Sequence, residues 1–166
     1  MQYREATTED APQIAALHAQ SWQQAYRGIL RDEFLDGPVL QDRADLWQRR
    51  LSAPPDNLFV LLALENQNLC GFVSVLGNDD PVWGALIDNL HVHPLQKGQG
   101  LGAQLMYKAA EWIKRRDSAG RFYLWVYEAN LPARRFYEKL GGVNSERVLH
   151  ENPGGGSAYC LRYTWM

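Results

Sequence analysis

The segment that most constrains the fold runs from Val92 to Gly102, VHPLQKGQGLG, and joins an apolar strand to an amphipathic helix. Glycine has no Cβ, so Gly98, Gly100 and Gly102 let the backbone turn and bring consecutive N–H groups toward one anion. The helix that follows presents its unpaired amides and the positive end of its dipole at the same place. Its apolar stripe consists of Leu101, Leu105, Ala109, Trp112 and Ile113. The pattern predicts a strand–loop–helix unit that cradles a diphosphate.

Other glycine-rich loops fit this segment less well. A Walker loop needs Gly-Lys followed by Ser or Thr, and that triplet is absent. A dinucleotide-binding loop could use Gly98, Gly100 and Ala103 in its looser form. It also needs an acidic residue about 20 residues further on, where residues 121–123 offer none. A plain tight turn between a strand and a helix also uses glycine, so the loop by itself leaves that alternative open.

The composition of the chain excludes several classes of protein. With 166 residues and 46% hydrophobic content, we expect one domain, residues 1–166, with a full core. The net charge is −2 and no long Lys/Arg run is present, so we expect no nucleic-acid partner. No stretch approaches ~18 consecutive apolar residues and no signal-peptide pattern is seen, which predicts a cytoplasmic protein with no membrane partner. Cys70 and Cys160 match no metal or redox spacing and are predicted to be buried thiols.

Hydrophobic periodicity predicts an alternation of strands and helices along the chain. Strands are expected over 2–6, 58–64, 69–75, 83–92, 121–127, 142–148 and 158–163. A first helix is expected behind Asp10, carrying Ile14, Leu17, Trp22 and Tyr26. A second helical region is expected after Gly28 and includes 42–51, and further helices are expected over 101–116 and 131–140. The order strand, loop, helix, strand between 83 and 127 makes a right-handed crossover, so strands 83–92 and 121–127 should be parallel neighbours. The predicted fold is α/β or α+β with a mixed sheet.

A second motif, EANLPARRFYEKLG, follows the predicted strand 121–127 and covers residues 128–141. Helical spacing divides it into two faces. The face expected to pack on the sheet consists of Ala133, Phe136 and Leu140. An adjoining stripe, which combines an amide, a cation and a phenol, consists of Asn130, Arg134 and Tyr137. This stripe begins just beyond the C-terminal end of a parallel strand, where open sheets bind ligands, so we interpret it as part of the same site.

Together the two motifs resemble those of the GNAT superfamily of acyl-CoA-dependent N-acyltransferases. The resemblance covers nearly the whole chain and rests on LHVHP (90–94) with KGQGLG (97–102), and on Asn130, Ala133 and FYEKLG (136–141). It implies a three-layer α/β (α+β) fold whose central mixed, mostly antiparallel sheet has splayed parallel central strands and flanking helices. Two positions depart from the family pattern. Lys97 stands where Gln or Arg is usual, and Gly142 stands where Phe usually follows the helix.

The resemblance implies acetyl-CoA as the co-substrate and assigns residues to it. The backbone of Leu90, His91 and Val92 would pair with the pantetheine arm, and an amide near Leu90 would face the thioester oxygen. The diphosphate would be held by the amides of Lys97, Gly98, Gln99, Gly100, Leu101 and Gly102. The pantetheine would be bonded by Asn130, would pass the small Ala133, and would bring its sulfur to Tyr137.

Transfer of the acetyl group to a primary amine needs an acid and a base but no covalent enzyme intermediate. An amine with a solution pKa of ~10 must lose a proton before it attacks the thioester, and the departing thiolate is helped by a proton, which the Tyr137 phenol would give. Asp88, just before the splay, is the expected base. An equal alternative is that Asp88 is simply a polar residue at a half-solvated strand position, with no catalytic role. His91 and His93 are the next candidates. This His-x-His pair lacks a third ligand, so no metal is expected, and His18 is expected to be structural.

The motifs leave the acceptor open. A small-molecule amine and the amine of a peptide or protein both fit, and the acceptor pocket is expected to draw on Trp22, Tyr26, Trp83 and residues 151–156. A binding module that senses acyl-CoA without turnover is the alternative function. Such a module would use the same glycine loop but would need neither Tyr137 nor Asp88. A monomer and a homodimer are both compatible with the sequence.

Overall fold

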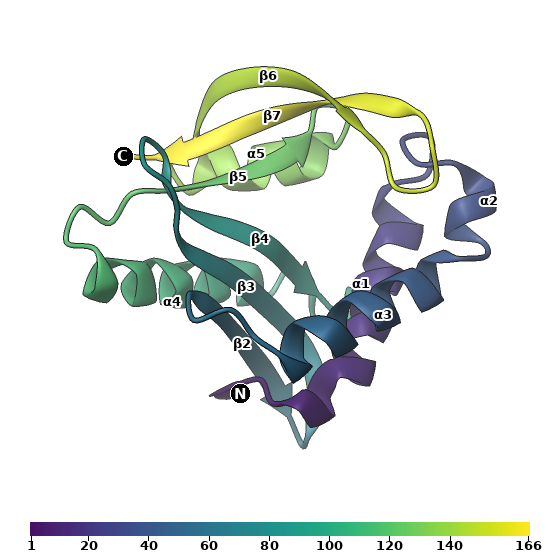
Figure 1. Cartoon of the computed structure of the whole chain (residues 1–166), viewed down its shortest axis with the longest axis horizontal. Coiled ribbons are helices and arrows are strands. Elements are labelled where there is room, and N and C mark those ends of the chain that lie inside the picture. Colours follow the sequence, from purple (N-terminus) through teal and green to yellow (C-terminus); the bar gives the residue numbers. More distant parts are fainter.

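The computed structural model describes all 166 residues, which form a seven-stranded sheet with helices on both faces (Figure 1). The strands are β1 (Gln2–Glu5), β2 (Leu58–Glu65), β3 (Asn68–Asp80), β4 (Gly84–Val92), β5 (Phe122–Tyr127), β6 (Val143–Glu151) and β7 (Ser157–Trp165). The α-helices are α1 (Ala11–Ala25), α2 (Asp32–Leu35), α3 (Val39–Ser52), α4 (Leu101–Arg116) and α5 (Leu131–Lys139), and short 3-10 turns cover Thr8–Asp10 (η1) and Pro94–Gln96 (η2).

The sheet has the strand order β1-β2-β3-β4-β5-β7-β6, in which β4 and β5 are the one parallel pair. Their pairing is confined to Ala85 with Phe122 and Leu86 with Tyr123. Beyond these residues β4 and β5 separate, so the sheet divides into two halves joined at one end (Figure 1). The predicted mixed, mostly antiparallel sheet with splayed central strands is therefore confirmed.

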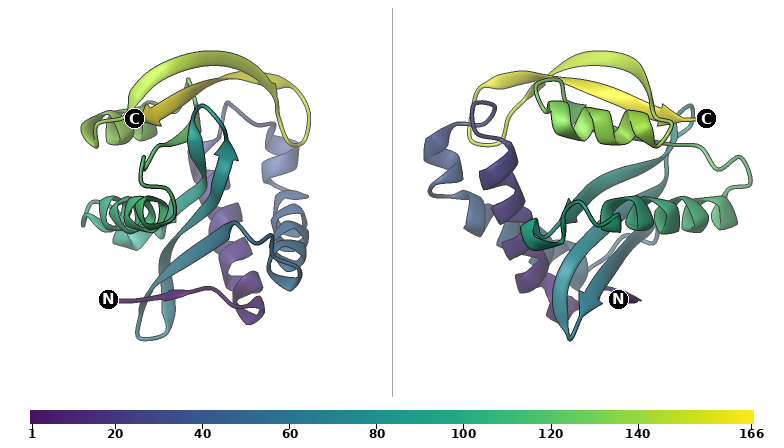
Figure 2. Two further views of the ribbon diagram at one scale, coloured as in Figure 1. Left: turned by 60° about the vertical axis from the view of Figure 1, so that its left-hand side comes forward. Right: turned by 180° about the vertical axis from the view of Figure 1, so that it is seen from behind.

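Helices α4 and α5 cover one face of the sheet, and α1 and α3 cover the other (Figure 2). The stripe predicted on α4 is buried in the larger core: Leu105 and Ala109 are completely inaccessible to solvent. A second core lies under α1 and α3, where Ile14 and Trp47 pack against Leu62 and Phe72 of the sheet. Each face of the sheet is thus a separate apolar layer.

Several element boundaries differ from the prediction. Strand β3 continues to Asp80, because it turns directly into β4. Helix α3 (Val39–Ser52) contains the predicted helical stretch 42–51. Helix α1 ends at Ala25, so Tyr26 lies outside it as the C-cap. The polar turn between β2 and β3 places Asn66 and Gln67 at positive φ, which is typical of a two-residue hairpin. None of the helices combines the length and hydropathy that crossing a bilayer requires.

Candidate active site

The glycine loop lies between the end of β4 and the start of α4, as predicted. Gly98 and Gly100 have φ of +76° and +81°, a left-handed conformation that favours glycine, and a Cβ added at either would meet no atom within 4 Å. The first helical bond in this region runs from the Gln104 amide to the Gly100 carbonyl. The amides of residues 98–103 therefore have no acceptor within the protein. Six unpaired donors at the positive end of a 16-residue helix form a site suited to an anion.

Gly102 has a different role from the one predicted. It belongs to the first turn of α4 and takes no part in the left-handed turn. A Cβ at Gly102 would lie 3.2 Å from the Phe136 ring and 3.7 Å from a Val92 methyl group. The missing side chain thus allows α5 to pack closely against the start of α4, and it joins the two sequence motifs directly.

The splay leaves one edge of β4 without a strand partner beyond Leu86. On its other edge β4 pairs with β3 from Leu90 to Val92, and the next amide, that of His93, donates to the Cys70 carbonyl of β3 (2.7 Å). Backbone groups alternate in direction along a strand, so the amides of Leu90 and Val92 point away from β3, into the splay. This edge offers the backbone groups that the predicted pairing with an extended ligand requires.

Helix α5 begins beside the splay with Asn130 as its N-cap. The Asn130 Oδ1 accepts a hydrogen bond from the Ala133 amide (3.4 Å), so its other amide atom, Nδ2, remains free to donate. Arg134 does not share a free stripe with Asn130, because its guanidinium donates to the Glu128 carbonyl (3.0 Å) and to the Tyr163 hydroxyl (3.4 Å). The three residues predicted to pack on the sheet, Ala133, Phe136 and Leu140, do contact the larger core.

Tyr137 lies on the buried side of α5, against Phe136, Tyr163 and Trp165. Burial raises the pKa of Tyr137 to about 12. The phenol therefore carries its proton at neutral pH and can donate it. The neighbouring Tyr163 hydroxyl donates to Glu138 (2.5 Å), whereas the Tyr137 hydroxyl has no hydrogen-bond partner within the protein and is free for a ligand.

Gly142, which lies shortly after the end of α5 at Lys139, packs against Trp165. A Cβ at Gly142 would lie 2.7 Å from the Trp165 indole and 3.0 Å from the Tyr137 carbonyl. The indole stacks on Phe122 (4.9 Å between centroids) and donates through Nε1 to the Leu140 carbonyl (3.0 Å). Trp165 therefore occupies the space beside α5 that an aromatic side chain at residue 142 would fill, and this departure from the family pattern leaves the packing under Tyr137 intact.

Asp88 sits at a β-bulge of β4, because Ile87 and Asn89 pair with consecutive residues of β3 and Asp88 has no partner. Its Oδ2 accepts from the Arg50 guanidinium of α3 and from the Asn89 amide, both at 2.8 Å. The structure gives Oδ1 no partner within the protein. Asp88 faces α3, on the side of the sheet opposite α4 and α5.

The three histidines named above have distinct surroundings. His93 caps η2 by accepting from the Leu95 amide (3.2 Å). His91 packs on the α1 side of β4, 4.6 Å from the His18 ring, and burial lowers the pKa of His91 to about 3. His18 is buried and accepts at Nδ1 from the Trp47 indole (2.9 Å), as a structural residue would.

No group of three or more His, Cys, Asp or Glu side chains is arranged to hold a metal ion. Cys70 and Cys160 are buried free thiols, as predicted.

Aromatic residues predicted for the acceptor side do gather near the splay. Trp22 contacts Tyr26 (5.7 Å between centroids), and Tyr26 contacts Tyr127 of β5 (5.0 Å). Burial raises the pKa of Tyr127 to about 12. Trp83 lies apart from this cluster, under the Arg162 guanidinium (5.0 Å) at the other end of β5.

Two residues near the site, Arg50 and Tyr127, were not predicted. Tyr127 could have been found, because Tyr123, Trp125 and Tyr127 alternate along β5 and so share one face. No local pattern marks Arg50, whose partner Asp88 lies far away in sequence. Asn152 lies within the predicted range 151–156, and its Nδ2 donates to the Ile29 carbonyl (3.2 Å).

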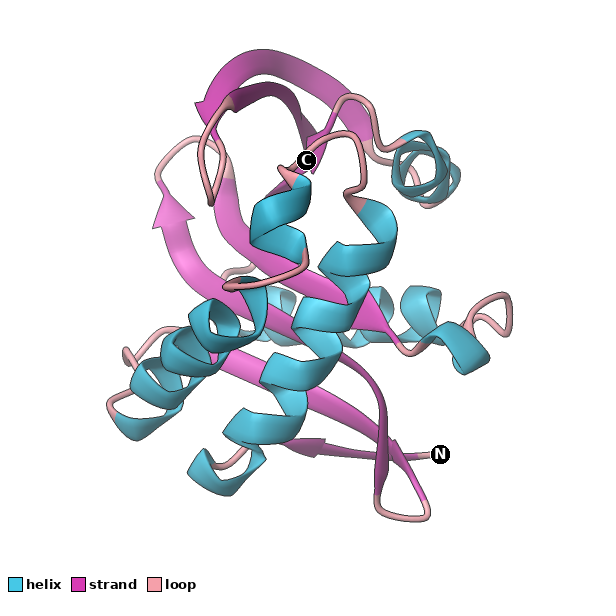
Figure 3. Ribbon diagram, turned by 90° about the vertical axis from the view of Figure 1, so that its right-hand side faces the viewer, coloured by secondary structure: helices cyan, strands magenta, loops and turns pink.

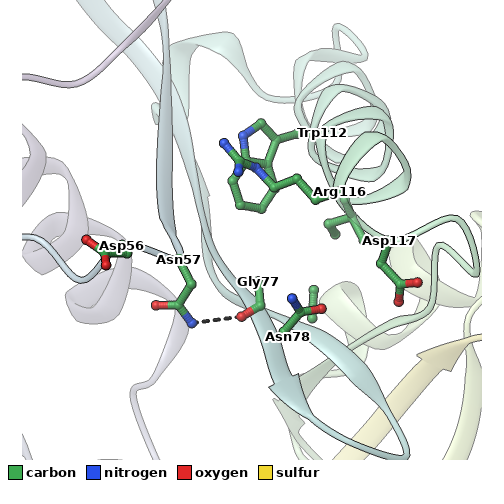
Figure 4. A pocket seen from close by; sticks show the side chains of 9 residues that line it. Asp56, Asn57, Gly77, Asn78, Trp112, Arg116 and Asp117 are labelled. Atoms are coloured by element: carbon green, nitrogen blue, oxygen red, sulfur yellow. Dashed lines mark hydrogen bonds between the residues drawn. The ribbon is translucent and has the colours of Figure 1, made fainter.

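A hollow of about 420 Å³ lies at the opposite end of α4 from the glycine loop (Figure 4). Arg116 covers the Trp112 ring there (4.2 Å), and the Asn57 amide donates to the Gly77 carbonyl (2.7 Å). None of the predicted site residues lines this hollow.

Solved structures share this fold, and a curated protein is similar to the chain in sequence. A GCN5-related N-acetyltransferase structure from Rhodopseudomonas palustris superposes with a TM-score of 0.76 at 24% identity, covering 98% of this chain and 93% of that one. The PaiA N-acetyltransferase of Thermoplasma acidophilum, solved in complex with coenzyme A, superposes with a TM-score of 0.73 at 17% identity, covering 99% and 98%. Among curated sequences, the uncharacterized N-acetyltransferase YuaI of Bacillus subtilis is 27% identical over 151 residues, 90% of this chain and 82% of YuaI.

The profile of the acetyltransferase (GNAT) family matches residues 18–142, a range that includes the glycine loop, Asp88, the N-cap of α5 and Tyr137. The match extends over more than half of the chain and agrees with the fold and with both motifs. The chain belongs to the GNAT acetyltransferase family.

Proposed function

We propose that this protein transfers an acetyl group from acetyl-CoA to a primary amine by direct attack on the thioester. The observation that carries the proposal is the run of six unpaired amides at the start of α4, placed beside the splay of β4 and β5. The amides of residues 98–103 and the cation of Lys97 would hold the diphosphate. The pantetheine would then extend along the free edge of β4, with the Asn130 Nδ2 as a side-chain donor.

The acid in this mechanism is Tyr137. The amine attacks the thioester carbon, a tetrahedral intermediate forms, and the C–S bond breaks to release the CoA thiolate. An amide of β4 in the splay, such as that of Leu90, would stabilise the developing oxyanion. The raised pKa keeps the Tyr137 phenol protonated, so it can pass its proton to the thiolate sulfur.

The base in this mechanism is Asp88. Its Oδ2 is held by Arg50 and Asn89, which fixes the carboxylate, while Oδ1 is open to accept a proton from the amine directly or through water. His91 is a poorer candidate, because its ring packs against His18 and Phe72 on the α1 side of β4.

The test is to follow free thiol while the protein is incubated with acetyl-CoA and a panel of primary amines. We expect amine-dependent thiol release, with Tyr137→Phe lowering kcat roughly 10²- to 10⁴-fold, the range for loss of general acid catalysis. The affinity for CoA should stay close to the wild-type value, because the ring and its packing are kept. Tight CoA binding without thiol release for any amine would favour the alternative, an acyl-CoA sensor. Unchanged turnover in Tyr137→Phe would assign proton delivery to water.

A further inference from the structure

Proton donation by Tyr137 leaves a negative charge that a neighbouring group must stabilise. Burial raises the pKa of Tyr137 to about 12, whereas an ordinary thiol has a pKa of roughly 8.5. Transfer of the proton from this phenol to a thiolate therefore runs energetically uphill, and it leaves a phenolate in a half-buried place. An unpaired charge in such a place is costly, so the phenolate needs a hydrogen-bond donor.

The donors on the α5 side of the sheet already have other partners. Burial is the only cause of the raised pKa of Tyr137, so no cation lies against its hydroxyl. The occupied donors are the Tyr163 hydroxyl with Glu138 (2.5 Å), the Arg134 guanidinium with the Glu128 carbonyl (3.0 Å) and Tyr163 (3.4 Å), and the Trp165 indole with the Leu140 carbonyl (3.0 Å). A free donor for the phenolate must therefore come from another part of the fold.

Tyr26 supplies a phenol from the opposite side of the sheet. It is the C-cap of α1, and the α1–α2 connection that follows it lies beside the tip of the β6–β7 hairpin (Figure 3). Its ring contacts Tyr127 (5.0 Å between centroids) and Trp22 (5.7 Å). Tyr127 is the last residue of β5, at the end of the strand farthest from its pairing with β4. The Tyr26 ring is thus held where the splay is widest.

The hydroxyls of Tyr26 and Tyr137 are both unpaired and both accessible. No hydrogen bond within the protein engages either hydroxyl, and the buried polar atoms that lack a partner lie elsewhere, on His18, Ser74 and Arg121. Both hydroxyls therefore border space that water or a ligand can enter. The pKa of Tyr26 is raised, first by burial and next by the charge of Tyr137, so the two phenols lie within electrostatic reach of each other.

The other polar neighbours of Tyr26 are poorer donors for this charge. The Tyr127 hydroxyl already donates to the Asn152 Oδ1 (3.1 Å). Cys160 pairs with Tyr127 across β5 and β7, and its buried thiol is a weak donor. Tyr26 is therefore the neighbour of Tyr137 that combines a strong O–H donor with the absence of any other partner.

We propose that Tyr26 is a positioning residue that acts through Tyr137, its hydroxyl donating to the Tyr137 oxygen directly or through one water molecule. The proposal rests on the proposed function. In the step concerned, the O–H bond of Tyr137 breaks, its proton joins the CoA sulfur, and the electron pair stays on the Tyr137 oxygen. Tyr26 keeps its own proton and shares it with that oxygen in a charge-assisted hydrogen bond. A proton from the solvent then restores Tyr137.

Replacing Tyr26 with phenylalanine tests this role, because it removes the hydroxyl and keeps the ring contacts. We expect Tyr26→Phe to lower kcat for thiol release roughly 10- to 150-fold, the range for one hydrogen bond to a charged group. The Kd of CoA should stay within about twofold of the wild-type value. Tyr107→Phe, which alters an exposed phenol of α4, is the matched control and should keep the wild-type kcat. An unchanged kcat in Tyr26→Phe would overturn the inference and leave the proposed function standing.

A double variant distinguishes an action through Tyr137 from a role in the fold alone. No phenolate forms in Tyr137→Phe, so adding Tyr26→Phe to it should change kcat by less than about twofold. A further loss as large as in the wild-type background would overturn the inference. Wild-type turnover in Tyr137→Phe alone would overturn both this inference and the assignment of the acid. No amine-dependent thiol release by the wild type would overturn the proposed function itself.

A second pair of variants serves should Tyr26→Phe fail to fold. Tyr26→Gln and Tyr26→Leu introduce side chains of similar size, of which only glutamine carries an N–H donor. We expect the higher kcat in Tyr26→Gln, whereas equal values in the two variants would overturn the inference.

Discussion

Replacing Gly100 with alanine separates backbone strain from ligand binding, because Gly28 provides a matched control. Both residues have φ of +81°, and at both an added Cβ would meet no atom within 4 Å. A left-handed conformation costs an L-residue roughly 1–2 kcal/mol. Gly100→Ala and Gly28→Ala should therefore each lower the free energy of unfolding by about this amount. The corresponding fall in Tm is roughly 2–8 °C for a chain of this length.

Only Gly100→Ala should weaken the binding of CoA. Gly100 lies within the run of unpaired amides from 98 to 103, whereas Gly28 lies in the α1–α2 connection. Alanine keeps the amide of residue 100, but its Cβ would project into the open space beside the amides, where a phosphate must approach. A hydrogen bond to a charged group contributes about 1.5–3 kcal/mol, so displacing the phosphate from one amide should raise the Kd roughly 10- to 150-fold. Gly28→Ala should leave the Kd within about twofold of the wild-type value.

Two calorimetric experiments measure the two effects. Thermal unfolding gives the loss of stability caused by strain, and titration with CoA gives the Kd. S-acetylpantetheine lacks the diphosphate, so with this acetyl donor the wild type and Gly100→Ala should have the same acetyl-transfer activity. An equal rise of the Kd in both variants would assign the loss to strain rather than to the loop. A wild-type Kd in Gly100→Ala would refute the amide cradle.

Two further substitutions test the packing around the site and the acid stability of the fold. Gly142→Ala puts a Cβ against Trp165 and should destabilise the protein by roughly 1–3 kcal/mol, measured by urea unfolding; no loss would mean that the indole moves freely. The Arg4 guanidinium holds the pKa of Asp10 well below its usual range, so Asp10 stabilises the fold above the ordinary carboxyl pKa of ~3.9 and loses this effect as the pH falls toward the lowered value. Asp10→Asn should therefore be less stable than the wild type at neutral pH, and the two should converge on acidification; a gap independent of pH would contradict this.

The parts of the molecule that the sequence predicts are those encoded within one continuous segment. The stripe of α4, the crossover between β4 and β5, and the left-handed Gly98 and Gly100 depend on local spacing and on backbone sterics, and all three are confirmed. Element ends are less well determined, because neighbours far away in sequence decide them. The extra residues of β3 are held by pairing with β4, which no local pattern reveals.

Side-chain partners between distant segments could not be predicted in the same way. Asp88 was chosen for its position before the splay, but its contact with Arg50 depends on how α3 lies on the sheet. The stripe of Asn130, Arg134 and Tyr137 follows helical geometry, and tertiary contacts divide it. The Arg134 guanidinium donates to the Tyr163 hydroxyl of β7 and to the Glu128 carbonyl, and Tyr137, partly buried, packs against the larger core.

The contact between Gly102 and Phe136 explains why two motifs separated in sequence act as one signal. In the proposed mechanism the first motif would hold the diphosphate and the second places the Tyr137 phenol, so the distance between them must match the length of the pantetheine arm. That distance is set where α5 packs on the first turn of α4, and a Cβ at Gly102 would lie 3.2 Å from the ring of Phe136. Phe136 adjoins Tyr137 in the chain, so we expect a side chain at residue 102 to shift Tyr137, the proposed acid, as well as the loop. The third glycine of the loop therefore serves the placement of Tyr137, the proposed acid, whereas the first two serve the turn.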